Sequence, residues 1–275
     1  MYTSPSGPGP AIVLIHGLWM TALSWENWTN RYSGAGFRVI AESWPGMDGD
    51  IDALRADTTG IDNLGLTEIT DYYANIITGL DRPPIIMGHS FGGLITQLLL
   101  DRGLGAAGVA IDSSPVKGVL AVPASTLRSG FPVLKSPANR HRSVSLTPEE
   151  FHYAFTNTLT EAESLAAYRR YAVPGPGRVL FQGALANLSP HSPATVDVRN
   201  SKRAPLLIIA GGLDHVIPPK VSEANAKRQR QSEAITAYHE FPGRSHFTLA
   251  QQGWEDVADF ALRWALDPTE DVKSG

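Results

Sequence analysis

Six short, mostly apolar runs are spaced along the chain and separated by longer segments of mixed polarity. Most of these runs are continuously apolar rather than alternating, which is typical of strands buried on both faces of a parallel sheet. Strands are therefore predicted at 11–15, 37–41, 84–87, 107–111, 205–210 and 237–241.

Between these runs the apolar residues take the spacing of helices. Helices are predicted at 24–33, 67–80, 219–230 and 254–266, with one more directly after the third strand. A long loop is predicted to begin at 44–46. The alternation of buried strands and helices predicts a three-layer α/β/α fold around a mostly parallel sheet of about six strands.

The alternation stops between residues 115 and 202, where prolines interrupt the first part of the segment. Thr147 and Thr160 are each followed three residues later by glutamate, which is the signature of a capping box at a helix start. The sequence Pro-Gly-Pro-Gly at 174–177 is predicted to end the second of these helices. We predict a mainly helical cap or lid at 115–202, inserted into a core formed by 1–114 and 203–275.

Composition narrows the function classes. The chain has 275 residues, 43% of them hydrophobic and 18% charged, with a formal net charge of −4 and no cysteine. This composition suits a globular domain, gives no basic surface for nucleic acid, and excludes disulfides and cysteine ligands. Residues 1–10 lack the features of a signal peptide, and no run approaches a membrane span. We expect a cytoplasmic protein that is a monomer or homodimer, without nucleic-acid or membrane partners.

The third strand runs directly into Gly88-His89-Ser90-Phe91-Gly92 and then into an apolar helical pattern. A bare Gly-x-Ser-x-Gly is a weak signal, but a strand–turn–helix context makes it a nucleophile elbow. The flanking glycines let strand and helix approach closely, so Ser90 is predicted to stand exposed above the sheet.

A serine hydroxyl needs an adjacent base, which itself needs an orienting group. Asp214 follows the fifth predicted strand and His246 follows the sixth. The carboxyl ends of parallel strands meet at one edge of the sheet, and the order Ser, Asp, His fits a nucleophile elbow. His246 is thus predicted as the base and Asp214 as the acid, with Asp112, after the fourth strand, as the alternative acid.

Backbone N–H groups must stabilise the oxyanion, and Phe91 and Leu18 are the expected donors, with Trp19 as the alternative to Leu18. Trp19, Trp44, His89 and Phe247 are the candidates for the substrate pocket. The competing interpretation places these aromatics in the core and makes His89, like His16, a structural hydrogen-bonding residue. The histidines show no metal-ligand spacing and no Gly-x-Gly-x-x-Gly follows a strand, so neither metal nor nucleotide cofactor is expected.

Four landmarks, at 16–19, 88–92, 212–214 and 243–246, agree in order and spacing. With them the chain resembles an α/β-hydrolase-fold serine hydrolase of the esterase or lipase kind. The first strand is predicted to start about ten residues from the N-terminus, so we expect the usual leading antiparallel hairpin to be missing. In this the chain is similar to the compact branch of plant esterases and hydroxynitrile lyases.

The resemblance implies a cofactor-independent esterase that acts through an acyl-enzyme on Ser90. The apolar content of 115–202 favours a small to medium lipophilic ester or lactone as substrate. Three alternatives stay open: a cofactor-free perhydrolase or haloperoxidase, a hydroxynitrile lyase, and a non-catalytic small-molecule receptor. Val216 stands where the lyases usually have a lysine, which disfavours the second.

Overall fold

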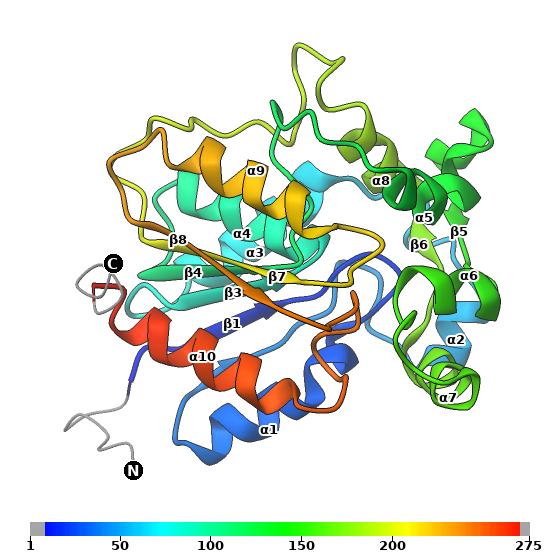
Figure 1. Cartoon of the computed structure of the whole chain (residues 1–275), viewed down its shortest axis with the longest axis horizontal. Coiled ribbons are helices and arrows are strands. Elements are labelled where there is room, and N and C mark those ends of the chain that lie inside the picture. Colours follow the sequence, from blue (N-terminus) through cyan, green and yellow to red (C-terminus); the bar gives the residue numbers. More distant parts are fainter. Residues whose placement is uncertain (1–8, 270–275) are drawn as a thin grey trace.

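A computed structural model describes residues 9–269 and contains a six-stranded sheet flanked by helices (Figure 1). Its spatial order is β2-β1-β3-β4-β7-β8, and every neighbouring pair is parallel. The strands are β1 (Ile12–Ile15), β2 (Val39–Ile40), β3 (Ile85–His89), β4 (Ala107–Ile111), β7 (Leu206–Gly211) and β8 (Thr236–Phe241). The predicted α/β fold, with a parallel sheet of six strands, is confirmed.

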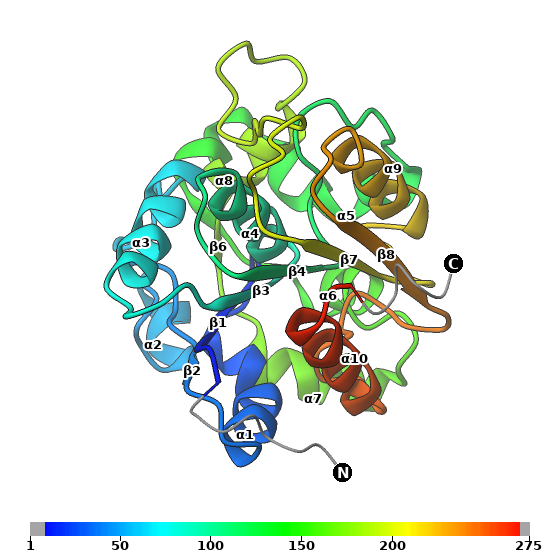
Figure 2. The ribbon, with the colours of Figure 1, turned by 90° about the vertical axis from the view of Figure 1, so that its left-hand side faces the viewer.

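Helices cover both faces of the sheet (Figure 2). On one face lie α3 (Leu66–Thr78), α4 (Phe91–Asp101) and α9 (Pro219–Gln229), and on the other lie α1 (Glu26–Gly34) and α10 (Trp254–Leu266). Successive strand residues point to opposite faces, so Val13 and Ile15 join one buried apolar cluster while Ile12 and Leu14 join the other. Two separate cores result, one on each side of the sheet.

The apolar runs locate the strands to within two residues at either end, and α10 spans the predicted 254–266. One strand is much shorter than predicted: β2 has only two residues, at an edge of the sheet where a single neighbour supplies its pairing. The short helix α2 (Ile51–Ala56) lies within the predicted long loop and begins at Asp50, whose carboxylate accepts a hydrogen bond from Ala53 N.

Between residues 115 and 202 most of the regular structure is helical, joined by long irregular stretches. It contains α5 (Ala124–Leu134), the 3-10 turn η2 (Pro137–His141), α6 (Pro148–Ala154), α7 (Glu161–Tyr171) and α8 (Gly177–Ala184), with β5 (Ser143–Val144) antiparallel to β6 (Gly175–Pro176). Both capping boxes are present, at Thr147 and Thr160. The prolines begin helices as well as ending them, since Pro123 is the N-cap of α5 and Pro176 that of α8.

This helical segment lies beside one end of the sheet (Figure 1). Residues 1–8 and 270–275 lie outside the described residues. The prediction that 1–10 do not form a signal peptide therefore falls almost entirely outside them. None of the helices between residues 9 and 269 is both long and apolar enough to cross a lipid bilayer.

Candidate active site

Ser90 occupies a tight turn between β3 and α4. Its backbone has φ 56° and ψ −120°, a conformation that L-residues rarely adopt and that concentrates at functional sites. A Cβ on Gly88 would lie 2.0 Å from Gly92 O, and one on Gly92 would lie 2.1 Å from Ile15 O. Because any side chain at either position would collide with backbone, only glycine permits this turn, as the sequence pattern indicates.

The loop after β1 passes directly over the turn. A Cβ on Gly17 would lie 2.7 Å from Ser90 Cβ and 3.0 Å from His89 O. His16 fixes this loop: its Nδ1 donates to Gly17 O at 2.8 Å, and its Nε2 accepts from Trp44 N at 2.9 Å. Burial lowers the pKa of His16 to about 4, against the opposing hydrogen bond to Gly17, so this ring is a neutral structural group.

Asp214 and His246 are brought together from the loops after β7 and β8. His246 Nδ1 lies 2.7 Å from Asp214 Oδ2, and both side chains are fully buried. Asp214 Oδ1 accepts from Val216 N and Ile217 N, which fixes the carboxylate. With Nδ1 donating to the carboxylate, His246 Nε2 is the basic atom, and it has no hydrogen-bond partner among residues 9–269.

Burial disfavours the imidazolium of His246, but the charge of Asp214 and its hydrogen bond outweigh this, so the pKa of His246 is raised overall. The imidazole lies beside the ring of His89, the residue before Ser90, with ring centroids 4.6 Å apart. His246 therefore lies near the elbow. The structure joins it to Asp214 by a hydrogen bond but shows none between its Nε2 and Ser90 Oγ.

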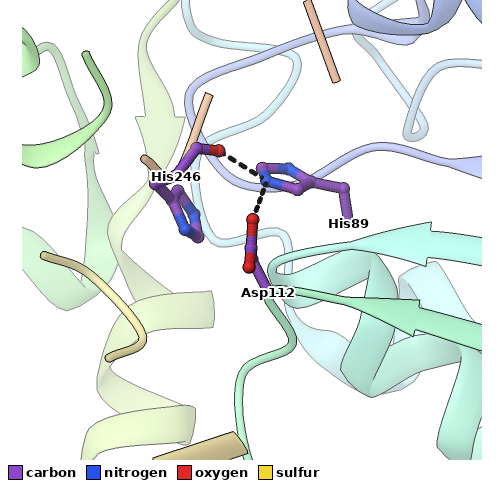
Figure 3. Close-up of side chains that lie close together, drawn as sticks. All are labelled: His89, Asp112 and His246. Carbon is purple, nitrogen blue, oxygen red and sulfur yellow. Dashed lines mark hydrogen bonds and ion pairs between the residues drawn. The ribbon is translucent and has the colours of Figure 1, made fainter. Parts of the chain in front are cut away.

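The alternative acid, Asp112, lies close to His89 and His246 (Figure 3). Its Oδ1 accepts from Gly211 N at 2.6 Å, and its Oδ2 lies 4.0 Å from His89 Nε2. Asp112 has φ 45° and is fully buried. Burial first, and then the neighbouring charge of Asp214, raise the pKa of Asp112 to about 8. The imidazole of His246 thus donates its hydrogen bond to Asp214, while Asp112 is a largely protonated acid at neutral pH.

His89 completes this cluster as a neutral ring. Its Nε2 donates to His246 O at 2.9 Å, and burial, followed by the charge of His246, lowers the pKa of His89 well below its ordinary value. One ligand atom from each of His89, Asp112 and His246 lies within 4.8 Å of the others. A metal ion needs deprotonated ligand atoms, whereas His89 Nε2 carries the proton that it shares with His246 O and Asp112 is mostly protonated. These three side chains fit a hydrogen-bonded cluster better than a metal site.

The raised pKa of Asp112 predicts an unusual pH dependence of stability. Between its ordinary value of 3.8 and about 8, the folded chain holds a proton that the unfolded chain releases. The free energy of unfolding should therefore fall as pH rises through this window. Asp112→Asn removes this contribution, so the variant should gain on the order of 1–3 kcal/mol relative to wild type between pH 4.5 and 8. Urea unfolding of both proteins at the two pH values measures this difference, and parallel pH profiles would contradict it.

The predicted oxyanion donors flank Ser90. Phe91 is the first residue of α4, and its N–H has no acceptor within the helix. Leu18 follows Gly17 in the loop that crosses the elbow, and both Leu18 and Phe91 line the cavity that contains Ser90. Both residues thus lie at the cavity that contains Ser90, and their role as oxyanion donors stays a prediction.

The cavity at Ser90 has a volume of about 170 Å³ and a mainly apolar lining. Of the predicted pocket residues, only Trp19 lines it. Trp44 is instead stacked on His16, with ring centroids 4.8 Å apart, and Phe247 packs against Tyr171. His89 is held by its bond to His246 O. Trp44, His89 and Phe247 are therefore core and supporting residues, as the competing interpretation proposes.

Most of the cavity lining was not singled out by sequence reasoning. Apolar side chains from the 115–202 segment form much of it: Val119, Val122, Leu127, Leu134, Leu180 and Ala184. Val216 and Ile217, just after Asp214, add to it. The apolar content of the segment was visible in the sequence, but which side chains face Ser90 depends on how its helices pack.

A sequence profile described as that of the alpha/beta hydrolase family matches residues 12–260. The chain belongs to the alpha/beta hydrolase family. Among curated proteins, the AB hydrolase superfamily protein YfhM of Bacillus subtilis is 36% identical over 88 residues, which are 32% of this chain and 29% of that protein. This match spans less than a third of the length of YfhM.

Solved structures of family members are similar over almost the whole chain. An extracellular alpha/beta-hydrolase from a Paenibacillus species, described as homologous in structure and function to tobacco salicylic acid binding protein 2, matches with a TM-score of 0.66 at 20% identity, covering 93% of this chain and 98% of that one. A monoacylglycerol lipase of Paleococcus ferrophilus matches with a TM-score of 0.64 at 20% identity, covering 94% and 96%. At these identities the likeness establishes the fold, and the predicted resemblance to an α/β-hydrolase is confirmed.

Proposed function

We propose that this alpha/beta hydrolase cleaves a carboxylic ester or lactone of a small to medium lipophilic substrate through an acyl-enzyme on Ser90. The observation that carries the proposal is the 2.7 Å hydrogen bond from His246 Nδ1 to the buried Asp214 carboxylate, beside a serine held in a strained turn. Ser90 is only 4% exposed and lines a cavity, so the prediction that it stands exposed above the sheet is wrong. An oriented base near a serine hydroxyl that faces a cavity is the arrangement that nucleophilic catalysis requires.

In the first half-reaction, Ser90 Oγ bonds to the substrate carbonyl carbon as its proton passes to His246 Nε2. Asp214 keeps Nδ1 protonated and stabilises the imidazolium that forms. The Leu18 and Phe91 N–H groups donate to the developing oxyanion, a contribution of about 3–4 kcal/mol per donor. The tetrahedral intermediate then collapses: the bond to the alcohol oxygen breaks, and that oxygen takes the proton from His246 Nε2.

In the second half-reaction, a water molecule attacks the acyl carbon and gives a proton to His246 Nε2. The bond from the acyl carbon to Ser90 Oγ breaks, and Oγ recovers the proton as the carboxylic acid leaves. Atoms and protons balance without a cofactor, since His246 returns to its neutral form at the end of each half.

The cavity supports a lipophilic substrate. Its lining is mainly apolar, and its 170 Å³ suits one acyl or alcohol group of modest size. Apolar side chains of the 115–202 segment are also exposed to solvent: Leu120, Val122, Leu127, Phe131 and Leu188. Because Val122 and Leu127 belong to both sets, an apolar surface continues into the cavity. We therefore assign 115–202 the role of a cap that selects substrate by size and hydrophobicity.

Labelling with a fluorophosphonate, followed by a chain-length series of p-nitrophenyl esters and lactones, tests the proposal. We expect one covalent adduct, located at Ser90 by peptide mass spectrometry, and a burst of p-nitrophenol equal to the enzyme concentration. Rates should peak at short to medium acyl chains. No labelling and no turnover, together with tight binding of an ester, would favour a receptor instead. Bromination of monochlorodimedone with acetate and peroxide identifies perhydrolase activity on the same serine.

A further inference from the structure

The loop that supplies Leu18 and Trp19 is held by the cap as well as by the core. The Trp19 indole Nε1 donates to Val144 O at 2.9 Å, and Trp19 O accepts from Val173 N at 3.0 Å. Val144 belongs to β5, and Val173 lies two residues before β6. One residue of the loop after β1 is thus bonded both to β5 and to the stretch that leads into β6.

The same two-stranded sheet packs tightly against the side chains of Leu18 and Trp19. Val144 of β5 pairs with Gly175 of β6. A Cβ on Gly175 would lie 2.8 Å from Leu18 Cδ1, 2.9 Å from Leu18 Cγ and 3.1 Å from Trp19 Cδ1. Real Cβ atoms essentially never approach other atoms within 3.0 Å, so Gly175 is the position that allows β6 to lie directly on Leu18.

The loop conformation that these contacts hold is strained. Trp19 has φ 65°, in the left-handed region that bulky residues avoid. Such a conformation persists only where surrounding contacts fix it. The cap segment next to the loop is itself anchored to the core, because Arg55 Nε donates to Ala172 O at 3.0 Å and Tyr171 OH donates to Glu26 Oε1 at 2.6 Å.

We propose that the β5–β6 pair is a positioning element for the oxyanion hole, and that Trp19 and Gly175 are its key residues. The inference rests on the proposed function, since it concerns the Leu18 N–H that is assigned there to the oxyanion. The pair touches the side chains of Leu18 and Trp19, and through them sets where the backbone of this loop lies relative to Ser90. Cap and core therefore share the construction of the active site.

A donor that stabilises charge only in the transition state affects kcat rather than substrate binding. Gly175→Ala displaces Leu18, and Trp19→Phe removes the bond to Val144 O while keeping an aromatic ring. We expect each variant to lower kcat about 10–100-fold, with KM within about threefold of wild type, because small displacements of catalytic groups are this costly. The affinity of a trifluoromethyl ketone, which forms an oxyanion with Ser90, should fall by the same factor as kcat.

Two matched variants separate positioning from general destabilisation. Trp28→Phe also removes a buried indole hydrogen bond to a backbone carbonyl, that of Leu249, but on the opposite face of the sheet. Gly34→Ala adds a methyl group where nothing lies within 4 Å. Both should keep the wild-type kcat and trifluoromethyl ketone affinity. Thermal unfolding of all four variants reports whether each is folded at the assay temperature.

Hydrogen exchange of the peptide covering 16–22 provides a readout that needs no turnover. The Leu18 and Trp19 amides should exchange faster in Gly175→Ala and Trp19→Phe than in wild type, Trp28→Phe or Gly34→Ala. If both Gly175→Ala and Trp19→Phe are folded and match wild type in kcat, in analogue affinity and in exchange rates, the positioning role is wrong. That result would leave the proposed hydrolase function standing. No ester turnover by wild type would instead overturn the proposed function. In that case, exchange rates at 16–22 that are the same in both variants as in wild type would separately overturn the coupling of cap and loop.

Discussion

Ser90→Ala is expected to lower kcat/KM for the best ester by about 10⁵-fold or more, and to abolish fluorophosphonate labelling. The reason is that Ser90 is the proposed nucleophile, and loss of the nucleophile from a Ser-His-Asp site costs on this order. The residual rate would come from the oxyanion donors and from substrate binding alone. Steady-state kinetics at enzyme concentrations high enough to detect this residual rate provide the measurement.

Ser222→Ala is the control for this variant. Ser222 is a fully buried serine of α9 whose hydroxyl has no hydrogen-bond partner among the described residues. Its removal should change kcat/KM by less than about twofold, because no bond is lost. Activity within tenfold of wild type in purified Ser90→Ala would contradict the acyl-enzyme mechanism, since it would show that the serine does not carry the acyl group.

Asp214→Asn is expected to lower kcat about 10⁴-fold with the fold intact. Asparagine offers its amide N–H where the carboxylate accepts a hydrogen bond, so His246 takes the wrong tautomer and loses the charge that stabilises its protonated form. The pKa of His246, which Asp214 raises, should fall in the variant. The imidazole resonances in an NMR pH titration measure this shift alongside the kinetics.

Asp112→Asn is the matched variant, because Asp112 is also a buried carboxyl close to His246 but is bonded to Gly211 N. An asparagine amide resembles the protonated acid that Asp112 is at neutral pH, so kcat at pH 7 should fall by less than about tenfold. The reverse order, with Asp112→Asn far more damaging than Asp214→Asn, would make Asp112 the catalytic acid and remove Asp214 from the mechanism.

The parts of the fold that local physics dictates were predictable from the sequence. Continuous apolar runs located the strands, because a strand covered on both faces needs apolar residues at every position. The capping boxes at Thr147 and Thr160 marked helix starts, because their hydrogen bonds form within four residues. The glycines at 88 and 92 marked the elbow for the same local reason.

What depends on long-range packing could not be predicted in this way. The sequence predicts that Pro132 interrupts regular structure, but it lies within helix α5, close to the C-terminal end of the helix. The sequence placed Asp112 near the site only as an alternative acid, since nothing local reveals that its neighbours keep it protonated. Trp44 was an open choice between pocket and core, and its stacking on His16 follows from where two loops meet.

The position in the sheet at which the inserted segment 115–202 leaves and rejoins the core has a consequence for altering substrate specificity. β4 and β7 are direct parallel neighbours, although 94 residues separate Ile111 from Leu206 in the chain. The whole insertion therefore leaves and re-enters between adjacent strands, and the ladder that joins them does not depend on its length or content. A graft that exchanges it for another insertion should preserve the scaffold. We expect an active hybrid only if the donor segment also replaces the contacts that Val144, Val173 and Gly175 make with the loop after β1.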